Sequence, residues 1–250
     1  MTEEAGERRA AFPQLRGIVP DAVLEWPHLR VVAWSAFFFL VALAVLWVSR
    51  IDLVHFPDGR LKPESTPYIN HESQANSFLH GHLDLTKELS GFITEPALYN
   101  GKEFCIPPPD KAPGVGSGIT LTPDPNCKMY LQHSPGPALM LLPGVAIFGL
   151  EMNQTLVSIV LAAITAPIVF LVVRKLVENE ATQVWLTVLF LFGTIFWFTA
   201  ANGGVWYFSH TAALLFLFAA LYTTFVRRNA FLTGAFVGAA FLCRPRTVPP

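Results

Sequence analysis

The residues best suited to acid–base chemistry lie in one polar stretch of this chain, from Arg50 to about Ser134. His71 and Glu72 stand side by side there, and an imidazole or a carboxylate is the type of group that takes a proton from a hydroxyl. Three further carboxylates are rivals for such a role: Asp52, Asp58 and Glu64. A solvated polar helix face would explain His71 and Glu72 without any chemistry.

Six of the seven histidines lie in this stretch or in a later polar segment: His55, His71, His80, His82, His133 and His210. Neutral imidazole binds divalent metals, and His80 and His82 with Asp84 could contribute ligands. Their spacing matches no recognised metal motif, however. We therefore assign no cofactor and no metal residue, a divalent metal stays open, and ordinary polar loop positions are the favoured interpretation.

A pair of arginines, Arg244 and Arg246, follows the apolar segment that ends at Cys243. Guanidinium groups bind phosphate through paired hydrogen bonds, so the pair could hold a phosphate at a membrane boundary. Snorkelling to lipid headgroups is an equal alternative. His210, with Trp206 and Tyr207 in the same predicted short loop, is a candidate for the same cavity, although interfacial aromatics are also common belt residues.

Two of the three cysteines, Cys105 and Cys127, lie in the polar stretch and flank a Pro- and Gly-rich insert of 21 residues. A disulfide there would stabilise the insert by about 3 kcal/mol in the chain-entropy model, and an oxidising compartment would permit it. The alternative is two unrelated thiols. Cys243 lies in an apolar segment, where a free thiol behaves as a small hydrophobic group.

Long uncharged apolar runs surround the polar stretch and must position it. An apolar run of about 18 or more residues crosses the bilayer as a helix. Hydrophobic residues make up 52% of the chain and charged residues 14%, against about 25% charged in soluble domains. The net charge of -1 provides no basic surface for a nucleic acid.

We expect an all-α, polytopic transmembrane helical bundle with a large outer first loop that carries juxtamembrane helices. Its apolar runs are Val31–Val48, Thr155–Val173, Ala181–Ala201 and Thr211–Val226.

Short-loop basic residues usually mark the cytoplasmic side of a membrane. The basic groups are the arginines before the first apolar run, up to Arg30, then Arg174–Lys175 and Arg227–Arg228. All of them fall on one side only if Pro135–Gly149 does not cross. As a helix that stretch would be roughly 22 Å long, which is too short, and prolines interrupt it. We therefore expect it to lie at the outer interface.

This topology predicts a multi-pass protein of the bacterial inner membrane with a cytoplasmic N-terminus. Residues 1–30 form a cytoplasmic segment that precedes a retained signal anchor, and residues 31–49 form the first transmembrane helix. Residues 50–154 form a periplasmic loop. Residues 155–250 hold transmembrane helices two to five, the last over Ala230–Cys243. Because the chain stops at Pro250 just after an outward crossing, we expect it to be the front part of a longer protein.

Several passages together resemble a known family. They are Ala75–Leu85 (ANSFLHGHLDL), Leu98–Lys102 (LYNGK), Tyr130–Phe148 and Phe241–Pro245 (FLCRP). In order and spacing they resemble the bacterial polytopic membrane glycosyltransferases of the GT-C superfamily, which are related to protein O-mannosyltransferases, aminoarabinose transferases and oligosaccharyltransferases. The resemblance covers roughly residues 30–246.

The resemblance implies transfer of a sugar from a polyprenyl-phosphate-linked donor to an acceptor at the outer face. It also implies an acid early in the first loop that acts as base, but the matching region, Pro67–Glu72, has no Asp. Glu72 is the nearest acid, and His71 is the alternative base. A helix that begins near Tyr68 would place Glu72 on one stripe with Asn76 and His80.

In the same scheme Arg244 and Arg246 bind the carrier phosphate, and His210 and His133 contribute to the substrate site. The expected partners are the lipid-linked sugar donor, the lipid bilayer and an acceptor of unknown identity. A transporter or flippase for lipid-linked substrates is the main alternative, but it would need buried polar or ionisable groups within the spans. A non-catalytic membrane fragment is a third interpretation.

Overall fold

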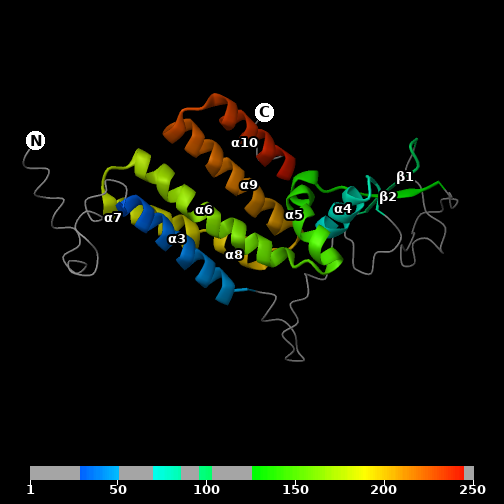
Figure 1. The fold of residues 1–250 in the computed structure, drawn as a ribbon, viewed down its shortest axis with the longest axis horizontal. Coiled ribbons are helices and arrows are strands. Elements are labelled where there is room, and N and C mark those ends of the chain that lie inside the picture. The colour runs from blue at the N-terminus through cyan, green and yellow to red at the C-terminus, as the bar shows by residue number, and fades with distance from the viewer. Residues whose placement is uncertain (1–28, 51–69, 86–95, 103–125, 245–250) are drawn as a thin grey trace, which may run out of the picture.

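The computed structural model describes residues 29–50, 70–85, 96–102 and 126–244, and it is an all-α helical bundle that carries one small hairpin (Figure 1). The chain begins in the bundle with helix α3 and continues there after the polar stretch. The bundle elements are α3 (Leu29–Val48), α6 (Gln154–Leu176), α7 (Glu180–Gly193), α8 (Phe196–Asn202), α9 (Val205–Tyr222), the π-helical turn η3 (Thr223–Arg227) and α10 (Ala230–Cys243).

Three of these segments are long and apolar enough to cross a membrane: α3, α6 and α9 continued by η3. Helices α7 and α8 form a fourth if the pair, bent by 48°, is one span. The expected multi-pass helical membrane protein is therefore confirmed. Helix α10 has 14 residues, or about 21 Å, which is shorter than a full span, so a fifth crossing stays a prediction.

Three of the bundle helices begin at an asparagine. The side chains of Asn153, Asn179 and Asn229 each accept a hydrogen bond from the backbone N–H three residues later, at the starts of α6, α7 and α10. An N-cap of this kind typically contributes about 1 kcal/mol. Polar caps thus set the point at which each apolar run becomes helical.

Helix α6 lies at the centre of the bundle, between α3 and α9, and α9 in turn packs against α10 (Figure 1). On α6 the small side chains of Ala162, Ala163 and Ala166 are fully buried, and small residues let apolar helices approach closely. Phe38 of α3 meets Phe170 of α6 with ring centroids 5.2 Å apart. This packing makes the two helices a rigid base for the loop between them.

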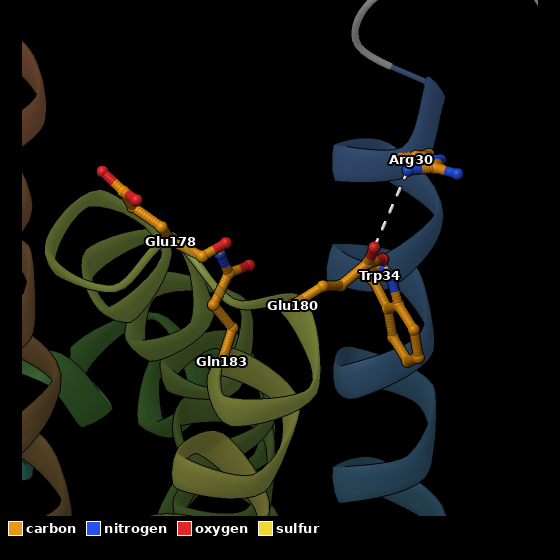
Figure 2. Close-up of polar contacts among 5 residues, drawn as sticks. All are labelled: Arg30, Trp34, Glu178, Glu180 and Gln183. Atoms are coloured by element: carbon orange, nitrogen blue, oxygen red, sulfur yellow. Dashed lines mark hydrogen bonds and ion pairs between the residues drawn. The ribbon is translucent and has the colours of Figure 1, made fainter. Parts of the chain in front are cut away.

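Glu180 fastens the starts of α3 and α7 at one end of the bundle (Figure 2). The indole Nε1 of Trp34 donates to Glu180 Oε1 at 2.7 Å, and an Arg30 nitrogen lies 3.7 Å from Glu180 Oε2. Helix α6 ends and α10 begins at this same end (Figure 1). The basic groups at Arg30, Arg174–Lys175 and Arg227–Arg228 therefore share one end, as the topology requires, and the cytoplasmic identity of that end stays a prediction.

The opposite end carries what the structure describes of the first loop. It holds helix α4 (Asn70–Leu79), helix α5 (Pro135–Phe148), the short helix η2 (Gly149–Glu151) and a hairpin of β1 (Pro96–Tyr99) with β2 (Lys128–Leu131). The strands are antiparallel, with Pro96 opposite Leu131. The hairpin was not predicted, because each strand has only four residues.

Helix α5 lies across the end of the bundle and does not run along its length (Figure 1). Its first turn touches the end of α10 so closely that a Cβ added at Gly136 would lie 2.6 Å from the carbonyl carbon of Leu242. Helix α5 has 14 residues, which is short for a span, and its predicted place at one membrane face stays a prediction.

The predicted short loop Asn202–His210 is wrong in its extent. Only Gly203 and Gly204 separate α8 from α9, so His210 and its aromatic neighbours lie in the first turns of α9. The reversal is this tight because Gly203 adopts a left-handed conformation with φ of 59°, which glycine adopts without steric cost.

Candidate functional site

Helix α4 is polar in sequence and yet buried in the protein. Its residues from Asn70 to Gln74 are all buried, and His71 and Glu72 have no exposed surface. The helix packs against α5, and its Ala75 joins an apolar cluster with Ala138 of α5 and Phe208 of α9. The alternative interpretation, in which His71 and Glu72 lie on a solvated polar helix face, is therefore wrong. His80, later in the same segment, is exposed.

The side chain of His71 links α4 to α9. Its Nε2 lies 3.0 Å from the backbone oxygen of Val205 and 3.2 Å from Ser209 Oγ. Since a carbonyl oxygen only accepts, Nε2 carries the proton, and Nδ1 is the unprotonated nitrogen. Nδ1 is buried and has no hydrogen-bond partner among the described residues. The imidazole thus offers one unused acceptor.

Burial lowers the pKa of His71 from 6.5 to about 3, with a smaller lowering from the charge of His133, while the Val205 hydrogen bond opposes the shift. His71 is therefore neutral at physiological pH. In that form it can accept a proton or a hydrogen bond at Nδ1.

Glu72 is another buried polar group of α4 without a hydrogen-bond partner among the described residues, as are the side-chain oxygens of Ser73, Gln74 and Ser77. Neither carboxyl oxygen has a hydrogen-bond partner among the described residues, and burial raises the pKa of Glu72 from 4.5 to about 8, with a smaller opposing effect from the polar backbone of Glu72 itself. A buried polar group without a partner costs about 1–3 kcal/mol. Groups held in such a state are concentrated at functional sites.

His133 comes beside His71 from a distant part of the chain. It lies between β2 and α5, and its ring centroid is 5.5 Å from that of His71 and 6.3 Å from that of Trp206. Of the predicted substrate-site residues, His133 therefore shares a cluster with both candidate bases, since Glu72 adjoins His71 in the chain.

Arg244 and His210 both lie at this end of the bundle, Arg244 at the end of α10 and His210 near the start of α9. Arg244 caps the end of α10, next to the α5 contact, and its positive charge acts on His210 of α9. The structure thus brings these two predicted residues together. Four other predicted or rival residues lie outside the described part of the chain: Asp52, Asp58, Glu64 and Arg246, as does His55.

The residues proposed as possible metal ligands are not arranged for that purpose. His80 Nδ1 bonds to the backbone oxygen of Asn76 at 2.8 Å, His82 is exposed, and Asp84 pairs with Lys128 of β2 at 3.5 Å. Within the described ranges, no three His, Cys, Asp or Glu side chains are grouped so that they could hold a metal ion.

The cysteines differ as predicted in environment. Cys127 is disulfide-bonded, and Cys243 is a free, buried thiol at the end of α10. Cys105 lies outside the described residues, so its pairing with Cys127 stays a prediction.

A set of polar contacts next to the site was not predicted from the sequence. At the start of α6, Gln154 Nε2 donates to the Gly203 oxygen at 2.7 Å, and Thr155 Oγ1 donates to the Asn202 oxygen at 3.1 Å. These bonds fix the link between α8 and α9, and with it Val205, whose backbone oxygen is the partner of His71. Two adjacent polar residues at the head of an apolar run were the available signal.

Comparison of the chain with protein-family models, curated proteins and solved structures finds no match.

Proposed function

We propose that this protein is a membrane glycosyltransferase similar to the GT-C enzymes, which moves a sugar from a polyprenyl-phosphate-linked donor to an acceptor at the outer face of a bacterial inner membrane. The end of the bundle with the basic residues would face the cytoplasm, and the end with α4 and α5 would face outward. The observation that carries the proposal is the buried carboxyl group of Glu72 in α4, which has no hydrogen-bond partner among the described residues.

A base works best when its pKa lies near the working pH. The pKa of Glu72, about 8, meets this requirement better than an ordinary carboxylate does. In the proposed step the ionised form of Glu72, which is the major form only above about pH 8, takes the proton of the acceptor hydroxyl, and the hydroxyl oxygen forms a bond to the anomeric carbon of the sugar. The bond from that carbon to the carrier phosphate oxygen breaks, and the polyprenyl phosphate leaves.

Arg244 would bind the carrier phosphate before and after this step. It stands at the end of α10 on the side of the bundle that holds α4, and a guanidinium group is suited to phosphate oxygens. His71 would accept a hydrogen bond at Nδ1 and so help to orient the acceptor. Because Glu72 is enclosed in this structure, the acceptor reaches it only if the protein around α4 shifts.

The proposal is tested with protein in proteoliposomes, supplied with polyprenyl-phosphate-linked hexose and pentose donors. Glu72→Gln keeps the shape of the side chain and removes the proton acceptor, so transfer should fall while donor binding persists. The matched control is Asp84→Asn, which removes an acid of the same loop that is already paired with Lys128. Transfer at the wild-type rate by Glu72→Gln would show that the base is elsewhere.

The second arm concerns the donor. Arg244→Ala removes a charged donor whose hydrogen bonds are worth about 1.5–3 kcal/mol each, so donor binding should weaken about ten-fold or more. Arg174→Ala, at the opposite end of the bundle, is the control and should bind the donor normally. If wild-type protein transfers no sugar from any donor, the non-catalytic alternative is favoured.

The transporter alternative receives no support from the described spans. Their buried polar side chains are neutral, such as Thr165, Thr187 and Thr211, and each of these donates a hydrogen bond to a backbone oxygen four residues earlier. Ionisable groups inside spans are the usual mark of a transport path.

A further inference from the structure

A cavity of about 680 Å³ lies between α6, α9 and α10, near the end of the bundle where α9 ends. Its walls are mainly apolar and come from three helices: Ile168 and Leu171 of α6, Ala219 of α9, and Leu232 and Phe236 of α10. The volume falls in the range typical of sites for small organic ligands. Apolar walls of this kind are suited to contact with a hydrocarbon chain.

The polar groups of this cavity are gathered at the turn from α9 to α10. Arg227, Asn229 and Tyr222 all line it there. Arg227 Nε donates to the Tyr222 hydroxyl oxygen at 3.2 Å, which holds the guanidinium group beside the opening. The site therefore has an apolar body and one basic edge.

The turn that carries these groups has an unusual backbone conformation and a hydrogen bond to the next helix. Thr223–Arg227 is π-helical, a form found frequently at functional sites. The Thr223 hydroxyl lies 3.0 Å from that of Thr233 on α10, which ties the turn to the next helix. Arg228 then takes a left-handed conformation with φ of 52°, which is uncommon for a residue with a side chain.

The charge around the opening is positive. Arg227 and Arg228 form no ion pair with a described carboxylate, and Lys175 lies one turn beyond Leu171 on the same face of α6. The nearest acids along the chain are Glu178, whose carboxylate forms no ion pair with a described residue, and Glu180, which is engaged by Trp34 and Arg30 (Figure 2). An anionic group is thus favoured at this edge.

We propose that this cavity is a binding site for an anionic phospholipid, with an acyl chain between α6, α9 and α10 and the headgroup phosphate at Arg227. Basic pockets between membrane helices bind anionic headgroups in this way. The site is at the opposite end of the bundle from Glu72 and does not depend on the proposed glycosyl transfer. Both halves of the site select this occupant, because a zwitterionic lipid carries a cation beside its phosphate and therefore has no net negative charge to match the basic edge.

The test uses the full chain in detergent micelles, supplied with phosphatidylglycerol or phosphatidylcholine of identical acyl chains, and counts retained lipid by native mass spectrometry. Phosphatidylglycerol should be retained preferentially. Arg227→Gln should weaken its retention by about five-fold or more. Arg174→Gln, which removes an exposed arginine at the same end of the bundle but outside the cavity wall, is the matched control and should retain it.

A second variant separates a lipid from a free phosphate. Leu232→Trp fills the cavity from α10, where Leu232 is 39% exposed, so it should reduce phosphatidylglycerol retention while leaving the arginine edge intact. Excess inorganic phosphate should not displace the lipid from wild-type protein. Equal retention of the two lipids, or normal retention by both Arg227→Gln and Leu232→Trp, would overturn the proposal.

Discussion

His71 Nε2 lies 3.0 Å from the backbone oxygen of Val205, so a residue of the first loop is bonded to the first residue of a membrane helix 134 positions later. The bond fixes the tautomer of the imidazole and keeps its unused nitrogen, Nδ1, inside the protein. It also places the neighbouring Glu72 at the boundary between the bundle and the loop. The chemistry that we propose depends on this attachment.

The first prediction concerns the pH dependence of stability. Glu72 has a pKa raised from 4.5 to about 8, so its unfolded form loses a proton before its folded form does, and stability should fall as the pH rises from about 4.5 to about 8. The contribution is on the order of 5 kcal/mol at most. His71 has a pKa lowered to about 3, so it has the opposite effect: its contribution to stability is lost as the pH falls from about 6.5 to about 3.

These two effects oppose each other between about pH 4.5 and 6.5, so thermal stability in micelles should be highest there and should decline on both sides. Glu72→Gln cannot ionise, and it should therefore remove most of the alkaline decline. An alkaline decline of equal size in Glu72→Gln would assign it to another group.

The second prediction is that Pro135–Gly149 does not cross the membrane. Single cysteines at Phe148, which is 62% exposed, and at Lys175 should face opposite sides in protein that lacks the native cysteines. In intact cells an impermeant thiol reagent should label Phe148→Cys, and it should label Lys175→Cys only after permeabilisation. Labelling of Lys175→Cys alone from outside would reverse the topology.

The third prediction tests the contact between α5 and α10. Gly136→Ala should destabilise the protein by about 1–3 kcal/mol, because its Cβ would meet the backbone of Leu242 and Cys243 at 2.6–2.7 Å. Gly238→Ala is the matched control: this helical glycine has nothing within 4 Å of an added Cβ, so the change should be neutral or stabilising by a few tenths of a kcal/mol. Thermal unfolding of both variants is the measurement, and equal effects would argue against the close approach.

The fourth prediction is that Cys105 is the partner of Cys127. A non-reduced digest analysed by mass spectrometry should contain the two peptides joined, and reduction should separate them. Cys243 should react with a thiol reagent only after denaturation, since its side chain is buried. Free thiols at both loop positions, in protein prepared without reductant, would disprove the pairing.

The sequence alone determined the class of the protein and the approximate positions of its apolar helices, but not all of their limits, since α9 begins at Val205 and the run Ala181–Ala201 is divided between α7 and α8. Apolar runs of sufficient length can only be satisfied as helices in a bilayer, and the predicted Thr155–Val173 lies within the observed α6. The length and prolines of Pro135–Gly149 likewise predicted a helix confined to one end. These properties are local, because each depends on the composition of a single segment.

Only the tertiary structure decided that Glu72 and His71 are buried. In sequence they belong to a short polar helix, and nothing in their immediate neighbours distinguishes a solvated helix from one enclosed by α5 and α9. Burial, the Val205 hydrogen bond and the approach of His133 all come from residues more than 60 positions away. The unusual pKa values of the site arise from desolvation by these distant segments, a quantity that is defined only once the chain has folded.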